Sequence, residues 1–127
     1  MTGLQHAALA VAGAIGIAVA LVHGALIQRL MVGPLRARTT PPLTPPLLRL
    51  IMPLLQFSTF TWLLGGAALI VASVLLDHGA RMAISVLVGS SYTFGAVANA
   101  QAVRTMHFGW LLMTAAVLLI VGANLPI

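Results

Sequence analysis

Four histidines and one carboxylate are nearly all that this chain offers for chemistry. Asp77 is the only acidic side chain among 127 residues, and there are no cysteines. A pair of side-chain carboxylates is therefore impossible, and no thiolate can serve as a nucleophile or metal ligand. Imidazoles can ligate a metal or a haem and can transfer protons. We predict that the chain is not an enzyme.

The composition indicates which solvent surrounds the chain. Hydrophobic residues make up 61% of it and charged residues 6%, whereas roughly 25% of the residues in a soluble domain are charged. Such a chain cannot cover a core with polar groups, so we predict that its main partner is the lipid bilayer. The net charge of +5 comes from arginines that flank apolar runs. No basic stripe with interleaved aromatic residues exists, which argues against nucleic-acid binding.

Four long apolar stretches predict four membrane-spanning helices. A helix needs about 20 apolar residues to cross a bilayer, and these stretches have about that length or more. They cover residues 7–27, 50–76, 82–102 and 107–124. We therefore expect a single all-α domain over residues 1–127, a polytopic membrane protein with four transmembrane helices in an antiparallel bundle.

The longest predicted connection, residues 33–49, is rich in proline and is expected to be a cytoplasmic loop. Arginines gather in the first and third connections, whereas the second holds only Arg81. The arginines of the first and third connections are Arg29, Arg36, Arg38, Arg49 and Arg104. By the positive-inside rule, both termini should lie outside. The expected location is a bacterial inner (plasma) membrane.

Four polar side chains fall at one predicted depth near the cytoplasmic boundary. His23 precedes Arg29 by six residues, a distance of roughly 9 Å along a helix. The same count from the nearest arginine places the other three at roughly 5–11 Å. These four residues, called the polar cluster below, are His23, Gln56, Asn99 and His107. Because polar groups in lipid face the bundle interior and find partners, we expect them to converge.

Two interpretations of the polar cluster stay open. The first is a closed network of hydrogen bonds between helices, with a purely structural role. The second is a haem held between His23 and His107, which lie at similar depth on antiparallel helices. A site for a single metal ion is disfavoured because no carboxylate or thiolate lies nearby. We expect the closed network.

Small residues recur at every fourth position of the first predicted helix. This small-residue ridge consists of Ala8, Ala12, Gly16, Ala20 and Gly24. Small side chains at that spacing lie on one helix face and let a second backbone approach closely, which is how helices associate in lipid. We therefore expect the ridge to pack against protein.

Three segments of the chain resemble a family of small bacterial inner-membrane proteins of unknown function with four predicted helices. The segments are 23–35 (HGALIQRLMVGPL), 56–62 (QFSTFTW) and 107–110 (HFGW). Members of that family often carry a histidine at the position of Gln56 and an acid in the stretch that holds Gln28. The resemblance implies the four-helix membrane fold and implies no activity.

These observations favour a non-catalytic membrane protein that acts through helix association. It would be a homo-oligomer or an accessory subunit of a larger membrane complex, so copies of the chain or other membrane subunits are the expected partners. A minimal oligomeric channel or transporter is one alternative, because four helices enclose little space on their own. A haem-binding electron-transfer subunit that uses His23 and His107 is a second. No cofactor is expected apart from that haem.

Overall fold

The computed structural model describes residues 2–37 and 44–125, and within these ranges the chain is helical throughout, without strands. Three continuous helical segments, Gly3–Ala37, Pro45–Leu75 and His78–Val103, are long and apolar enough to cross a membrane. A fourth apolar helix, Phe108–Asn124, is shorter. The helices are α1 (Gly3–Ile27), the π-helical turn η1 (Gln28–Val32), α2 (Gly33–Ala37), α3 (Pro45–Leu75), α4 (His78–Val103) and α5 (Phe108–Asn124). The prediction of an all-helical chain is confirmed.

The ends of the predicted loop 33–49 are helical. The helical segment that starts with α1 continues through η1 and α2 to Ala37, and α3 begins at Pro45. Residues 38–43, which include Arg38, lie outside the described residues. Pro45 and Pro46 occupy the first positions of α3, where a helix leaves its N–H groups unpaired in any case, so proline is tolerated there. Pro45 and Pro46 therefore mark the start of α3.

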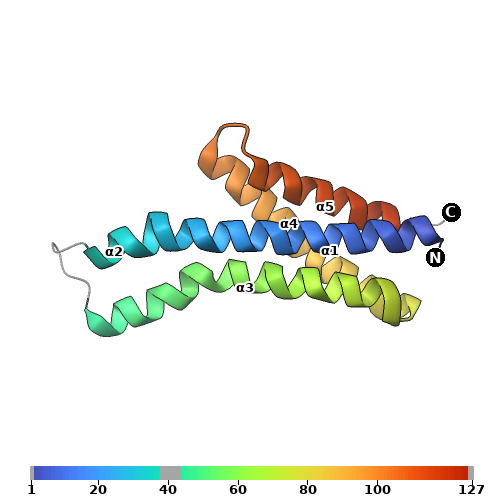
Figure 1. Cartoon of the computed structure of the whole chain (residues 1–127), viewed down its shortest axis with the longest axis horizontal. Helices are drawn as coiled ribbons and strands as arrows, with labels where there is room; N and C mark the ends of the chain where they lie inside the picture. The colour runs from blue at the N-terminus through green and yellow to red at the C-terminus, as the bar shows by residue number, and fades with distance from the viewer. Residues whose placement is uncertain (1, 38–43, 126–127) are drawn as a thin grey trace.

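Helices α1, α3, α4 and α5 form a ring in which each helix runs antiparallel to its two neighbours. Helix α1 packs against α3 and α5, and α4 packs against the same two helices from the other side. Figure 1 shows α1 and α3 lying side by side and extending beyond the turn that joins α4 to α5. At that turn the ends of α4 and α5 diverge from α1, whereas the opposite ends of the helices lie close together.

The closest approach between helices is a crossing of backbones at Gly13 of α1 and Gly66 of α3. A Cβ atom added at Gly13 would lie 2.5 Å from the Gly66 carbonyl oxygen, and one added at Gly66 would lie 2.5 Å from the Gly13 carbonyl oxygen. No side chain fits between the helices at this point. Helices in lipid gain little from the hydrophobic effect between them, so such close contact is what holds them together.

Large side chains of α3 and α4 fill spaces that glycines leave open in the core. Tyr92 is fully buried, and its hydroxyl donates a hydrogen bond of 3.2 Å to the Trp62 carbonyl oxygen. A Cβ atom on Gly16 would overlap that hydroxyl, and a Cβ atom on Gly95 would overlap the Trp62 ring. Tyr92 therefore ties α4 to α3 while it fills the space beside α1.

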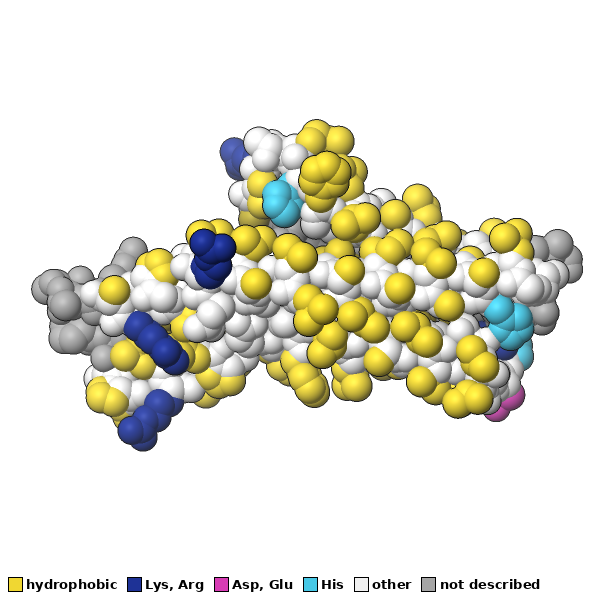
Figure 2. All heavy atoms as spheres, in the orientation of Figure 1, with side chains coloured by type: hydrophobic (Ala, Val, Ile, Leu, Met, Phe, Trp, Pro, Cys, Tyr) yellow, Lys and Arg dark blue, Asp and Glu magenta, His cyan; other side chains and the backbone are white. Residues whose placement is uncertain are grey.

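The outer surface of the helices is apolar along most of its length (Figure 2). Exposed leucine and valine side chains occur on α1, α3, α4 and α5, and exposed phenylalanines on the last three of these. The described cationic groups gather mainly at the end where α2 and α3 lie and at the turn between α4 and α5, and the acidic group lies at the other end. An apolar belt between two polar ends is the pattern expected of a chain surrounded by lipid.

We predict that the Gly13–Gly66 crossing tolerates no methyl group. Alanine favours a helix by about 1 kcal/mol over glycine, yet Gly13→Ala and Gly66→Ala should each destabilise the fold by about 1–3 kcal/mol through overpacking. Thermal unfolding of the purified protein in mild detergent measures the effect. Gly122→Ala is the matched control, because a Cβ atom there meets nothing within 4 Å. Equal midpoints for all three variants would contradict the tight crossing.

Candidate functional site

Three members of the polar cluster line one cavity of about 680 Å³ between α1 and the diverging ends of α4 and α5. His23 comes from α1, Asn99 from α4, and His107 directly precedes α5. Trp62 of α3 contributes to the wall, and the other lining residues are apolar except for a glycine. We call this space the imidazole cavity.

His23 joins α1 to α3 at the edge of the imidazole cavity. Its Nε2 atom lies 3.1 Å from the Ser58 hydroxyl oxygen. The centroid of its ring lies 4.7 Å from that of Trp62, with an angle of 53° between the ring planes. This tilted contact fixes the orientation of the imidazole and leaves Nδ1 available.

Gln56 lies outside the imidazole cavity and binds the backbone of α1. Its Nε2 atom donates a hydrogen bond of 3.1 Å to the Gly24 carbonyl oxygen. The approach is close because Gly24 has no side chain: a Cβ atom there would lie 2.7 Å from the Thr59 methyl carbon. Gln56 of α3 therefore makes a second contact with α1, about three turns from the contact between Gly13 and Gly66.

Asn99 and His107 bond within their own segments. Asn99 donates to the Gly95 carbonyl oxygen at 2.7 Å, one turn earlier in α4. His107 caps α5, because its Nδ1 atom accepts a hydrogen bond of 3.1 Å from the Gly109 N–H. Arg104, in the left-handed conformation with φ 52°, ends α4 and starts the connection that carries His107 away from α1.

The expected closed network between the four residues is not formed. No hydrogen bond joins any two members of the polar cluster, all of which lie within the described residues. The prediction fails because equal depth does not fix the direction in which a side chain points. Gln56 faces the contact between α1 and α3, whereas the other three line the imidazole cavity.

The imidazole cavity is lined by two histidines, His23 and His107, and by no acidic side chain. Within ranges 2–37 and 44–125, no three histidine or acidic side chains gather closely enough to hold a metal ion. A haem held by His23 and His107 stays a prediction.

The small-residue ridge packs inside the chain. Ala12, Gly16 and Ala20 are buried, and Ala8 and Gly24 are partly buried. The sequence pattern did not single out Gly13, which makes the closest contact with α3. Because the ridge faces the neighbouring helices of the same chain, it is not available to a second protein.

A polar group at the opposite end of the bundle was missed by the sequence prediction. Gln5 donates to the Leu125 carbonyl oxygen at 3.0 Å and links α1 to the end of α5. His6 Nδ1 contacts the Ser73 carbonyl oxygen. The spacing of Thr2 and Gln5 was the available signal, since the two form a capping box at the start of α1.

Asp77 and Arg81 act locally at the same end, in the connection before α4. The Asp77 carboxylate accepts a hydrogen bond of 3.0 Å from the Ala80 N–H. This backbone bond is the main reason that the pKa of Asp77 is lowered. Arg81 is buried and its guanidinium lies 3.1 Å from His78 Nδ1. The Asp77 contact caps the start of α4.

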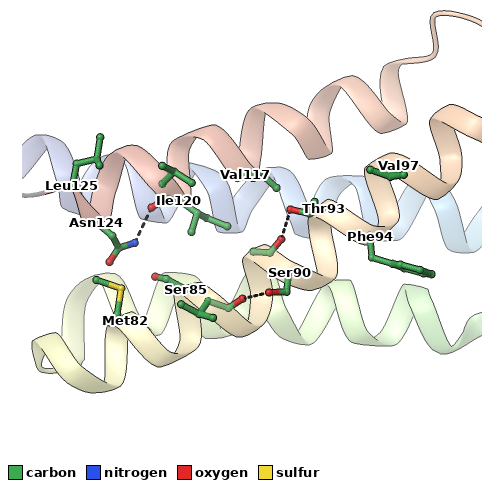
Figure 3. A pocket seen from close by; sticks show the side chains of 13 residues that line it. Met82, Ser85, Ser90, Thr93, Phe94, Val97, Val117, Ile120, Asn124 and Leu125 are labelled. Carbon is green, nitrogen blue, oxygen red and sulfur yellow. Dashed lines mark hydrogen bonds between the residues drawn. The ribbon is translucent and has the colours of Figure 1, made fainter.

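A second open space runs along the outside of the bundle between α4 and α5 (Figure 3). This groove of about 800 Å³, called the α4–α5 groove below, carries small and hydroxyl-bearing residues of α4 on one wall. They are Ser85, Gly89, Ser90 and Thr93. Three of them recur at every fourth position, the same spacing as in the small-residue ridge, and that spacing was the signal that could have revealed this face.

Ser85 differs from the other hydroxyl groups of the α4–α5 groove. Ser90 and Thr93 donate to the carbonyl oxygens of Val86 and Gly89 at 2.7 and 2.8 Å, as Figure 3 shows. Ser85 is only 3% exposed, and its hydroxyl has no hydrogen-bond partner in the described part of the chain. A buried hydroxyl without a partner is unfavourable, most of all in an apolar surrounding.

No family model, curated protein or solved structure matches the chain. The resemblance to small inner-membrane proteins therefore stays a prediction.

We predict that Gln56 stabilises the bundle through its bond to α1. Gln56→Leu keeps the volume but removes the donor, and should destabilise the fold by about 0.6–2 kcal/mol, the range for hydrogen bonds between helices in lipid. The thermal midpoint in detergent reports the loss. The control is Gln101→Leu, because Gln101 is exposed. A loss of the same size at both positions would show that the Gly24 bond contributes nothing.

Proposed function

We propose that the chain is a non-catalytic integral membrane protein that acts through helix association, with the α4–α5 groove as the contact surface. The observation that carries this proposal is the row of small residues on α4, Ser85, Gly89 and Thr93, which recur at every fourth position of the groove wall. A second helix in the groove would bring its backbone close to α4 along this row.

Two further features of the surface support the groove. The small-residue ridge of α1 is used inside the chain. Along α4, Gly89 is open: a Cβ atom there meets only the Ile120 methyl carbon at 3.7 Å. A second backbone can therefore approach α4 at Gly89, between the larger Val86 and Phe94 side chains that also line the groove.

We propose a second copy of the chain as the occupant of the groove. Two copies inserted in the same direction can pair about a two-fold axis perpendicular to the membrane, so that α4 meets α4. Small residues at four-residue spacing are the contact surface that such parallel pairs use. Each Gly89 would then face the partner's α4. An accessory role in a larger complex is the other form of the same proposal, with a foreign helix in the groove.

The proposed orientation places both termini outside a bacterial inner membrane and the connection between α2 and α3 in the cytoplasm. Arg29, Arg36 and Arg49 lie at the same end of the bundle as Arg104, whereas Arg81 lies at the other end. The positive-inside rule assigns the arginine-rich end to the cytoplasm.

For the topology, we expect reporters at the two ends of the bundle to give opposite signals. An alkaline phosphatase reporter fused after residue 127 should be active, since it is active only outside the cytoplasm. The same reporter inserted between Ala37 and Thr44 should be inactive, and a fluorescent protein there should be bright. A cytoplasmic C-terminal reporter would contradict the proposed orientation.

For the association, we expect Gly89→Leu to dissociate the purified oligomer in mild detergent. Leucine at this position projects into the α4–α5 groove and blocks the approach of a second backbone. Mass measurement of the protein–detergent complex should change from two copies to one. Gly122→Leu is the matched control, because a Cβ atom at Gly122 also has open space and this residue does not line the groove.

A gentler variant separates the groove wall from the buried hydroxyl. Ser85→Ala should leave the dimer dissociation constant unchanged, because Ser85 is only 3% exposed, while the thermal stability of the monomer stays equal or rises, because an unpartnered buried hydroxyl is removed. An oligomer that withstands Gly89→Leu would contradict the groove as the contact surface. A single copy bound to a different protein would favour the accessory form.

A further inference from the structure

The imidazole cavity has the shape and polarity of a ligand site. Its volume of about 680 Å³ lies within the range of roughly 300–1,000 Å³ that is typical of pockets for small molecules. Its walls are mainly apolar side chains of α1 and α5, and its few polar groups come from three different helices or helix ends. Apolar walls with a small number of convergent polar groups are the usual construction of such sites.

The polar groups of the cavity have hydrogen-bonding capacity left over. The Nδ1 atom of His107 accepts from the Gly109 N–H, so in the neutral ring the proton is on Nε2, which is a donor. Asn99 uses one N–H for the Gly95 carbonyl oxygen, and its side-chain oxygen and second N–H remain. His23 contacts Ser58 through Nε2 only. The cavity therefore offers at least two N–H donors to a ligand.

Aromatic rings favour a flat ligand head. The exposed Phe108 ring lines the cavity together with the His23 ring, and the Trp62 ring, only 5% exposed, packs behind His23. Flat aromatic surfaces stack on planar groups and offer little to a bulky, tetrahedral headgroup. The apolar walls suit a hydrocarbon tail, and the cavity opens to the outside of the bundle, from which a lipid-soluble molecule can enter.

From these features we infer that the imidazole cavity binds a quinone: a planar ring whose carbonyl oxygens accept hydrogen bonds from His107 and Asn99 and whose apolar tail lies along α1 and α5. The ring would lie against Phe108 and His23, close to the buried Trp62. This inference concerns binding only, and it is independent of the association through the α4–α5 groove.

Fluorescence of Trp62 provides the test. The chain has two tryptophans, and Trp110→Phe leaves Trp62 as the only one. Decylubiquinone, added to this variant in mild detergent, should quench the emission along a saturating curve. In the same background, His107→Ala and Asn99→Leu should each weaken the apparent affinity about three- to tenfold, the effect expected from losing one hydrogen bond. Ser90→Ala in the α4–α5 groove should leave it unchanged.

Two controls separate a quinone site from a plain apolar cavity. Decylbenzene has the ring and the tail without the oxygens, and it should not displace the quinone at equal concentration. Ala18→Phe narrows the cavity from the wall of α1 without removing a polar group, and should abolish saturable quenching even if the two polar variants fold poorly.

Three results would overturn the inference. Quenching that rises linearly and equally in all variants would show only contact within the detergent. Displacement by decylbenzene would show a cavity filled by hydrocarbon of any kind. An absorption band of haem in the purified protein, lost in His23→Ala, would show that His23 and His107 bind a haem instead of a quinone.

Discussion

The contact of backbones at Gly13 and Gly66 is the interaction on which the rest of the bundle depends. At this point α1 and α3 meet without side chains between them. One turn along α1, Gly16 also has no side chain, and the buried Tyr92 of α4 fills the space beside it. The Tyr92 hydroxyl then reaches the Trp62 carbonyl oxygen, which fixes α4 on α3. Helix α5 closes the ring between α4 and α1. In lipid this succession of close contacts takes the place of a hydrophobic core driven by water.

The same close packing explains where the open spaces lie. The glycine crossing and Tyr92 hold the helices together in the middle and toward the end with the termini, whereas the connection after Arg104 carries the start of α5 outward. The imidazole cavity forms where the helices diverge. The α4–α5 groove forms because Ser85, Gly89 and Thr93 are too small to cover the side of α4. One space suits a small molecule, and the other suits a helix.

Sequence alone predicts the helices well and the contacts poorly. Apolar stretches indicated the three helices that are long enough to cross a membrane and the shorter α5, because length and hydropathy are local properties. The helical ends of the expected loop were missed because proline is compatible with a first turn, as Pro45 and Pro46 show. The depth of the polar cluster could be counted from the arginines, but the direction of each side chain depends on how the helices are rotated. Gln56 therefore faces Gly24, while His107 caps its own helix.

The most direct test of the association through the α4–α5 groove uses the absence of cysteine from the chain. A single Thr93→Cys variant, oxidised in native membranes, should form a disulfide-linked dimer, because two copies paired along α4 bring these positions near the distance that a disulfide requires. Leu64→Cys, on the lipid-facing side of α3 at 59% exposure, should stay monomeric under the same treatment. Equal crosslinking at both positions, or none at Thr93→Cys, would contradict the account.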